Sequence, residues 1–88
     1  MSKILLVEDD LSYSRIIKTF LERNNFEVLS ANSVSKGLQL IGKEQPNLVI
    51  VDYRLPDGTG LQLLETSLNE NDTLPFILIT SYIDIRTA

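Results

Sequence analysis

The sequence predicts an α/β domain built around a parallel sheet, and three observations support this prediction. Short apolar runs at residues 4–7, 48–51 and 76–79 have the composition of strands buried on both faces. Segments with helical periodicity separate the strands, which gives the order β-α-β-α-β-α-β. No segment repeats another, and the connections are short. We therefore expect one doubly wound sheet with right-handed crossovers.

Composition limits the possible functions. The chain has 88 residues, of which 43% are hydrophobic, and this suits one small globular domain. It contains no cysteine and no histidine, which excludes disulfides, Ser-His-Asp triads and the usual zinc sites. The net charge of −4 argues against direct nucleic-acid binding, and the apolar runs are too short for a membrane span. The first ten residues turn acidic too early for a signal peptide, so a cytoplasmic location is expected.

The first half of the chain predicts two strands and two helices. Residues 4–7 form the first strand, and Asp10 is a plausible N-cap for the helix that follows. That helix repeats apolar side chains at helical spacing, namely Tyr13, Ile16, Ile17, Phe20 and Leu21, and it ends at Asn24-Asn25. Residues 26–31 alternate between apolar and polar, as in a strand nearer the sheet edge. Ser33 caps a second helix, which ends at residues 45–47 and has an inner face of Val34, Leu38 and Ile41.

The second half centres on the segment 48–60. The apolar strand ends abruptly at Asp52, and Pro56 with Asp57-Gly58 forces a turn. Thr59 and Gln62 have the spacing of a capping box. A third helix would start at about Gly60 and bury three leucines: Leu61, Leu64 and Leu68.

The C-terminal segment predicts a fourth strand. Pro75 introduces the apolar residues 76–79, and Thr80 and Ser81 terminate that strand. Residues 82–88 would begin a further helix.

The topology brings several acidic residues together. In the flavodoxin-like order, here 2-1-3-4, the first strand lies beside the third, and ligands bind at the carboxyl edge between them. That edge would gather one acidic cluster, with Thr80 and Ser81 beside it: Glu8, Asp9, Asp10 and Asp52. Neighbouring carboxylates repel one another, and Mg²⁺ relieves this repulsion because it prefers carboxylate oxygens and water. A carboxylate beside Mg²⁺ can also attack phosphorus and form an acyl phosphate.

The chain resembles the receiver domain of bacterial two-component response regulators. The matching segments are residues 4–10, 48–60 and 75–81, in the family's order and spacing. The resemblance implies that Asp52 is the phosphoacceptor and Thr80 the switch hydroxyl. It also implies a magnesium site made by Glu8, Asp9, Asp52 and the backbone carbonyl of Arg54, with Asp9 a direct ligand. The implied partner is a sensor histidine kinase or a phosphotransfer protein, and the output would be transcription regulation.

The chain departs from the family in one respect. Family members continue into a fifth strand, which ends in a lysine that contacts the phosphoryl group, and then a fifth helix. Residues 1–88 would therefore be an incomplete receiver domain that ends at the start of the fourth helix and lacks the fifth strand and helix. We expect slow phosphorylation, and self-association through the exposed edge of residues 76–79 or through the uncovered helical face.

Four other interpretations compete with this one. A phosphatase of the haloacid-dehalogenase type needs a second Asp where Arg54 stands, and Arg54 with Pro56 interrupts the ligand pattern of an EF-hand. Asp10 and Thr80 could simply cap helices. A pseudo-receiver, an interaction module that never takes phosphate, stays open because the lysine-bearing part is absent.

Overall fold

The computed structural model describes residues 2–69 and 73–79, which form nine helices and strands. In chain order these are β1 (Lys3–Val7), α1 (Leu11–Arg23), β2 (Glu27–Ala31), α2 (Val34–Glu44), β3 (Leu48–Asp52), β4 (Arg54–Leu55), β5 (Gly58–Thr59), α3 (Gly60–Leu68) and β6 (Phe76–Ile79). Each helix and long strand predicted within these residues is present. The helix expected after residue 81 lies outside the described residues.

The main sheet is parallel and has the order β2-β1-β3-β6. This confirms the predicted 2-1-3-4 order, in which the first strand lies between the second and the third. The turn predicted around Asp57 is the tip of a small antiparallel hairpin, in which β4 pairs with β5. The short β4 and β5 were not predicted as strands because a two-residue strand leaves no periodic pattern in a sequence.

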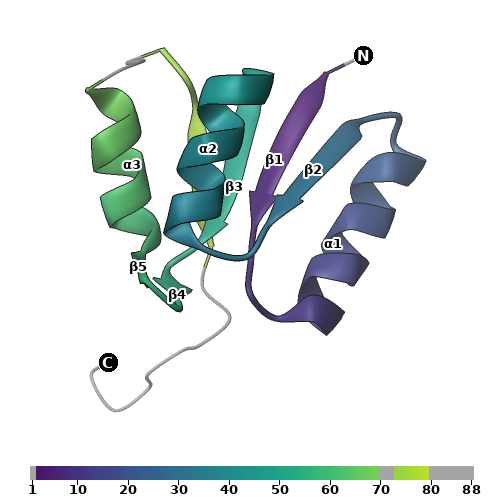
Figure 1. Ribbon diagram of the computed structural model, residues 1–88. Helices are drawn as coiled ribbons and strands as arrows, with labels where there is room; N and C mark the ends of the chain where they lie inside the picture. The colour runs from purple at the N-terminus through teal and green to yellow at the C-terminus, as the bar shows by residue number, and fades with distance from the viewer. Residues whose placement is uncertain (1, 70–72, 80–88) are drawn as a thin grey trace, which may run out of the picture.

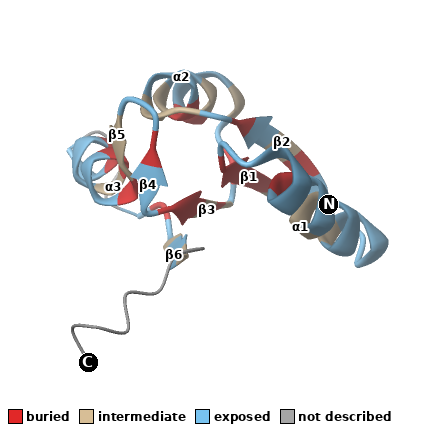
Figure 2. Cartoon of the chain, turned by 90° about the horizontal axis from the view of Figure 1, so that it is seen from below, coloured by how far each residue is buried: buried red, intermediate tan, exposed pale blue. Residues whose placement is uncertain are grey.

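Helices cover the two faces of the sheet unequally. Figures 1 and 2 show α2 and α3 over one face, whereas α1 packs against β1 and β2 from the other side. The core lies under α2 and α3, where the inward side chains of β1 and β3 are fully buried. These are Leu5, Val7, Val49 and Val51, and Leu63 of α3 packs against them. Within the described residues, no helix has the length and apolar character needed to span a membrane.

The predicted buried face of α3 was wrong for two of its three leucines. Leu61 and Leu68 are each 43% exposed and Leu64 is half-buried, whereas Leu63 and Ser67 are buried. The rotation of α3 is set at its first residue, Gly60, which is pressed against the end of β3. Positions three and seven residues after Gly60 therefore face the sheet. The predicted Thr59–Gln62 capping box is confirmed.

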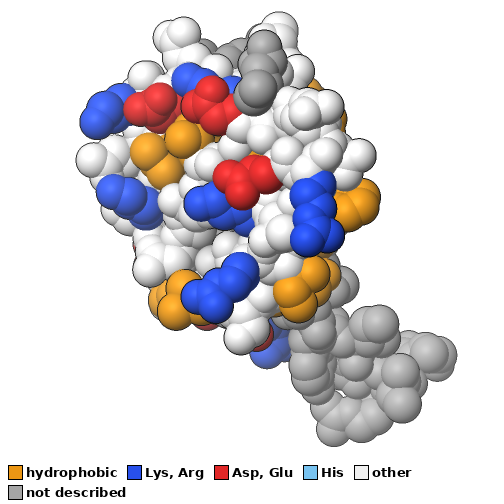
Figure 3. Space-filling model, turned by 90° about the vertical axis from the view of Figure 1, so that its right-hand side faces the viewer, with side chains coloured by type: hydrophobic (Ala, Val, Ile, Leu, Met, Phe, Trp, Pro, Cys, Tyr) orange, Lys and Arg blue, Asp and Glu red, His pale blue; other side chains and the backbone are white. Residues whose placement is uncertain are grey.

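The apolar stripe predicted for α1 is only partly covered. Ile17 and Leu21 are half-buried, but Ile16 is 67% and Phe20 65% exposed. Figure 3 views the side on which α1 lies and shows basic side chains around exposed hydrophobic ones. A shallow hollow there is lined by Arg15, Ile16, Thr19, Phe20 and Arg23.

Candidate functional site

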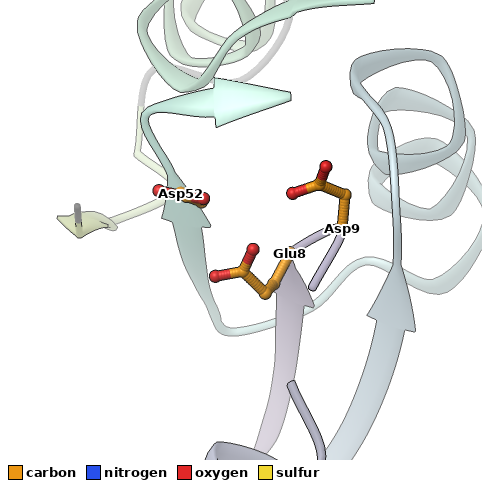
Figure 4. A group of neighbouring side chains, drawn as sticks. All are labelled: Glu8, Asp9 and Asp52. Carbon is orange, nitrogen blue, oxygen red and sulfur yellow. The ribbon is translucent and has the colours of Figure 1, made fainter. Parts of the chain in front are cut away.

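Three carboxylates converge at the carboxyl edge of the sheet. Glu8 and Asp9 follow β1, Asp52 ends β3, and one oxygen from each lies within 4.8 Å of the others. Figure 4 shows the three side chains above the ends of the two neighbouring strands. The register pairs Val7 with Val51, so Glu8 and Asp52 follow at the same level. Glu8, Asp9 and Asp52 therefore meet at this edge, as the predicted strand order requires.

Glu8 is the most deeply buried member of the cluster, with 2% of its surface exposed. Its backbone amide donates to the Ala31 carbonyl at 2.9 Å, which fixes the end of β1 against β2. Its side-chain Oε2 accepts from the Asp10 amide at 3.1 Å, whereas the buried Oε1 has no partner among the described residues. Burial raises the pKa of Glu8 from 4.5 to about 7; the Asp10 amide opposes this rise and the charge of Asp52 adds to it.

Asp52 is 4% exposed and sits on a tightly held backbone. The following Tyr53 donates its amide to the Ile79 carbonyl at 2.9 Å and accepts from the Gly60 amide at 2.8 Å. A Cβ atom at Gly60 would lie 2.5 Å from the Asp52 carbonyl oxygen and 2.8 Å from Leu78 Cδ1. Glycine is thus required at position 60, because any side chain would displace the Asp52 backbone and the Leu78 side chain.

The remaining acidic residues of the β1–α1 connection differ in role. Asp9 is exposed, so its carboxylate is the open side of the cluster. Asp10 accepts a hydrogen bond from the Tyr13 amide at 3.1 Å and is the N-cap of α1. The cap interpretation of Asp10 is therefore confirmed, and Asp10 is not a member of the three-carboxylate group.

The structure leaves the predicted roles of two other residues, Arg54 and Thr80, as predictions. Arg54 lies in β4, two residues after Asp52, and the role of its carbonyl stays a prediction. Thr80 and Ser81 lie outside the described residues.

Lys3, at the opposite end of β1, contacts Glu44 with its ammonium nitrogen 3.4 Å from a carboxylate oxygen. It is therefore not available to the cluster.

One contact near the site, between Asp57 and helix α2, was not predicted from the sequence. Asp57 was assigned only to a turn, but its carboxylate accepts hydrogen bonds from two amides of α2. Acidic residues do favour helix N-termini, yet nothing in the local sequence connects position 57 with a helix that begins at residue 34.

Comparison with known proteins identifies this arrangement. The family model described as "Response regulator receiver domain" matches residues 4–88. The chain belongs to this family. Receiver domains of response regulators are signalling domains, and this chain has their fold together with their acidic cluster.

Both curated and solved relatives agree with the assignment. The acid tolerance regulatory protein ActR of Rhizobium meliloti is 33% identical over 85 residues, covering 97% of this chain and 44% of ActR. The KDP operon transcriptional regulatory protein KdpE of Escherichia coli is 31% identical, covering 92% of this chain and 36% of KdpE. This chain thus spans less than half the length of either regulator. The non-phosphorylated HemR receiver domain of Leptospira biflexa superimposes with a TM-score of 0.87 at 33% identity, covering 99% of this chain and 70% of that one.

The donor set of the cluster fits a hard divalent cation. All three side chains offer carboxylate oxygens, the ligands that Mg²⁺ and Ca²⁺ prefer. The buried Glu8 Oε1 has no hydrogen-bond donor among the described residues, and a cation would supply the missing positive charge. Glu8 follows β1 and Asp52 ends β3, both buried, whereas the exposed Asp9 leaves an open side for water or phosphate.

Proposed function

We propose that this receiver domain accepts a phosphoryl group on Asp52 from a histidine kinase or a phosphotransfer protein, in a reaction that needs Mg²⁺. The observation that carries the proposal is the convergence of Glu8, Asp9 and Asp52 at the edge of the sheet. The proposed partner would place the domain in the cytoplasm. Output through transcription regulation is inferred from the curated relatives, which carry further sequence beyond the matched region.

The chain's own residues have distinct parts in this reaction. Glu8, Asp9, Asp52 and the backbone carbonyl of Arg54 would hold Mg²⁺, which neutralises charge on the transferring group. An Asp52 carboxylate oxygen forms a new bond to phosphorus while the bond from phosphorus to the donor imidazole nitrogen breaks, and the electron pair leaves with the imidazole. The Thr80 hydroxyl would hold one phosphoryl oxygen. Gly60 keeps the backbone behind Asp52 free of obstruction.

Labelling with acetyl phosphate tests this proposal. The chain should form a Mg²⁺-dependent phosphoryl adduct that peptide mass spectrometry maps to Asp52. Asp52→Asn should abolish the adduct while leaving the circular dichroism spectrum unchanged, and Glu65→Gln on the exposed part of α3 is the matched control. An adduct that persists in Asp52→Asn would move the acceptor elsewhere. No adduct on the native chain would favour the pseudo-receiver alternative.

A second copy of the chain is the other proposed partner. In β6, at the edge of the four-stranded sheet, Ile77 is 48% and Leu78 47% exposed. Beside it, an apolar hollow of about 440 Å³ is lined in part by Ile4, Ile50 and Ile77. Among the described residues β6 pairs with β3 alone, and an apolar edge of this kind is a template for strand pairing, so two β6 edges could pair around a twofold axis.

Sedimentation tests the association directly. The native chain should form dimers or larger species at tens of micromolar, an order-of-magnitude concentration at which exposed edges associate. Ile77→Lys should return it to a monomer, because a charge blocks edge pairing. A native chain that stays monomeric at this concentration would contradict the proposal.

A further inference from the structure

The tip of the β4–β5 hairpin is tied to helix α2 through one side chain. Asp57 Oδ1 accepts from the Val34 amide at 2.7 Å, and Oδ2 accepts from the Ser35 amide at 3.0 Å. Both carboxylate oxygens are therefore used, in a contact that spans 22 and 23 residues of sequence. Hydrogen bonds to an ionised acceptor are stronger than those between neutral groups, and the positive end of the helix dipole adds to them.

Helix α2 is capped by two residues with separate tasks. The local cap, Ser33, accepts from the Lys36 amide at 3.1 Å through its hydroxyl. The Val34 and Ser35 amides, which also lack partners within the helix, bind Asp57. Only the second cap connects α2 with another part of the chain.

The hairpin is also packed closely on its neighbours. A Cβ atom at Gly58 would lie 3.3 Å from Val34 Cγ2 and would collide with Gln62 Oε1. At the other end of the hairpin, the amide and the carbonyl of Tyr53 are both hydrogen-bonded, to Ile79 and Gly60. Arg54 therefore lies between two fixed points, Tyr53 at the end of β3 and Asp57 at the tip.

We propose that Asp57 is a positioning residue, which holds the hairpin on α2 and thereby keeps the Arg54 backbone in register beside Asp52 for cation binding. Asp57 is not a member of the three-carboxylate group, so it would act through the hairpin and not as a ligand. This inference rests on the proposed function, because it presumes that the cluster binds Mg²⁺. If Asp57 acts in this way, the orientation of α2 affects the position of the Arg54 carbonyl and thereby the affinity of the cluster for Mg²⁺.

Variants of the two α2 caps separate positioning from simple stabilisation. Asp57→Ala removes both hydrogen bonds from the hairpin to α2, and Asp57→Asn keeps one acceptor oxygen. Ser33→Ala is the matched control, since it removes the other cap of the same helix without changing the hairpin. Asp9→Ala serves as the positive control for loss of a proposed ligand. Each variant is measured by amide hydrogen exchange without metal and by titration with Mg²⁺.

Asp57→Ala should weaken Mg²⁺ binding roughly tenfold, at the lower end of the range for residues that orient metal ligands. Asp57→Asn should give a smaller loss, roughly threefold, because one hydrogen bond can persist. Amide exchange at Val34 and Ser35 should accelerate in Asp57→Ala. Ser33→Ala should accelerate exchange at Lys36 and lower the melting temperature, yet leave the Mg²⁺ dissociation constant unchanged.

Several outcomes would overturn the inference. Equal loss of Mg²⁺ affinity in Asp57→Ala and Ser33→Ala would reduce Asp57 to a helix cap. If both Asp57 variants bind Mg²⁺ with unchanged affinity, Asp57 has no positioning role. If amide exchange at Val34 and Ser35 is unchanged in Asp57→Ala, the hydrogen bonds to Asp57 do not form. If Asp57→Ala does not fold, Asp57→Asn carries the same comparison. A native chain that binds no Mg²⁺, or an Asp9→Ala variant that binds it normally, would instead contradict the proposed function.

Discussion

The acidic cluster and the hairpin tip lie at the same edge of the molecule, but their carboxylates have opposite surroundings. Glu8 is buried, and one of its oxygens lacks a partner among the described residues, whereas both oxygens of the exposed Asp57 accept amide hydrogen bonds. Burial raises the pKa of Glu8 to about 7, and the Ser35 and Val34 amides lower the pKa of Asp57. Burial without a matching hydrogen-bond donor thus marks Glu8 as suited to a cation, whereas two amide donors mark Asp57 as a residue that holds the fold together.

The largest expected effect is a pH dependence that comes from Glu8. Its pKa is about 7 in the folded chain against 4.5 for the unfolded group, so folding favours the protonated form. The resulting stabilisation is complete below the unfolded pKa and is lost as the pH rises through the folded pKa. Without Mg²⁺, the free energy of unfolding should fall by on the order of 3 kcal/mol between about pH 4.5 and about pH 8.

Denaturant titration of the native chain and Glu8→Gln at both pH values measures this difference. Glutamine keeps the acceptor for the Asp10 amide and cannot ionise. The free energy of unfolding of Glu8→Gln should therefore not show the fall that Glu8 ionisation causes between the two pH values. Parallel pH dependences in the two proteins would mean that Glu8 ionises normally. The contrast with Asp57 would then disappear.

The next effect concerns Mg²⁺ affinity at the cluster. Asp9 is the exposed member and the proposed direct ligand, so Asp9→Ala should weaken binding by at least roughly tenfold, the lower bound for residues that only support a ligand. Isothermal titration calorimetry of the native chain, Asp9→Ala and the control Glu65→Ala provides the comparison. An affinity unchanged by Asp9→Ala would show that the carboxylates do not act together.

The smallest effect should appear on the acidic side and have the opposite sign. The pKa of Asp57 is lowered from 3.8 by its amide partners, so its contribution to stability is present above that value and is lost as the pH falls through the folded pKa. Native chain and Asp57→Asn should therefore differ in stability near neutral pH and converge in acid. Thermal melts across this range measure it, and a constant difference would contradict the assigned hydrogen bonds.

Much of the site could be predicted from the sequence because it depends on strand order. Apolar runs identified the strands, and the parallel order placed the residues after β1 and β3 at one edge. Glu8, Asp9 and Asp52 therefore meet as expected. The caps at Asp10, Ser33 and Thr59 were predictable for a related reason, since each acts within three residues of itself.

The features that could not be predicted depend on contacts between distant segments. The rotation of α3 about its axis follows from the close approach of Gly60 to the Asp52 carbonyl, so Leu63 is buried in place of Leu61. Likewise, the contact of Asp57 with α2 depends on where the hairpin packs. Neither depends on hydrophobic periodicity, the main signal that a single sequence offers.

The most direct test is a measurement of the Glu8 pKa by carbon-13 NMR of side-chain carboxyl groups, with and without saturating Mg²⁺. A cation bound among Glu8, Asp9 and Asp52 should lower the pKa of Glu8 from about 7, because the bound charge favours the ionised form. Asp57 in the same sample should keep its low pKa and serves as the internal control. A Glu8 pKa that Mg²⁺ leaves unchanged would contradict the account of the cluster as a metal site.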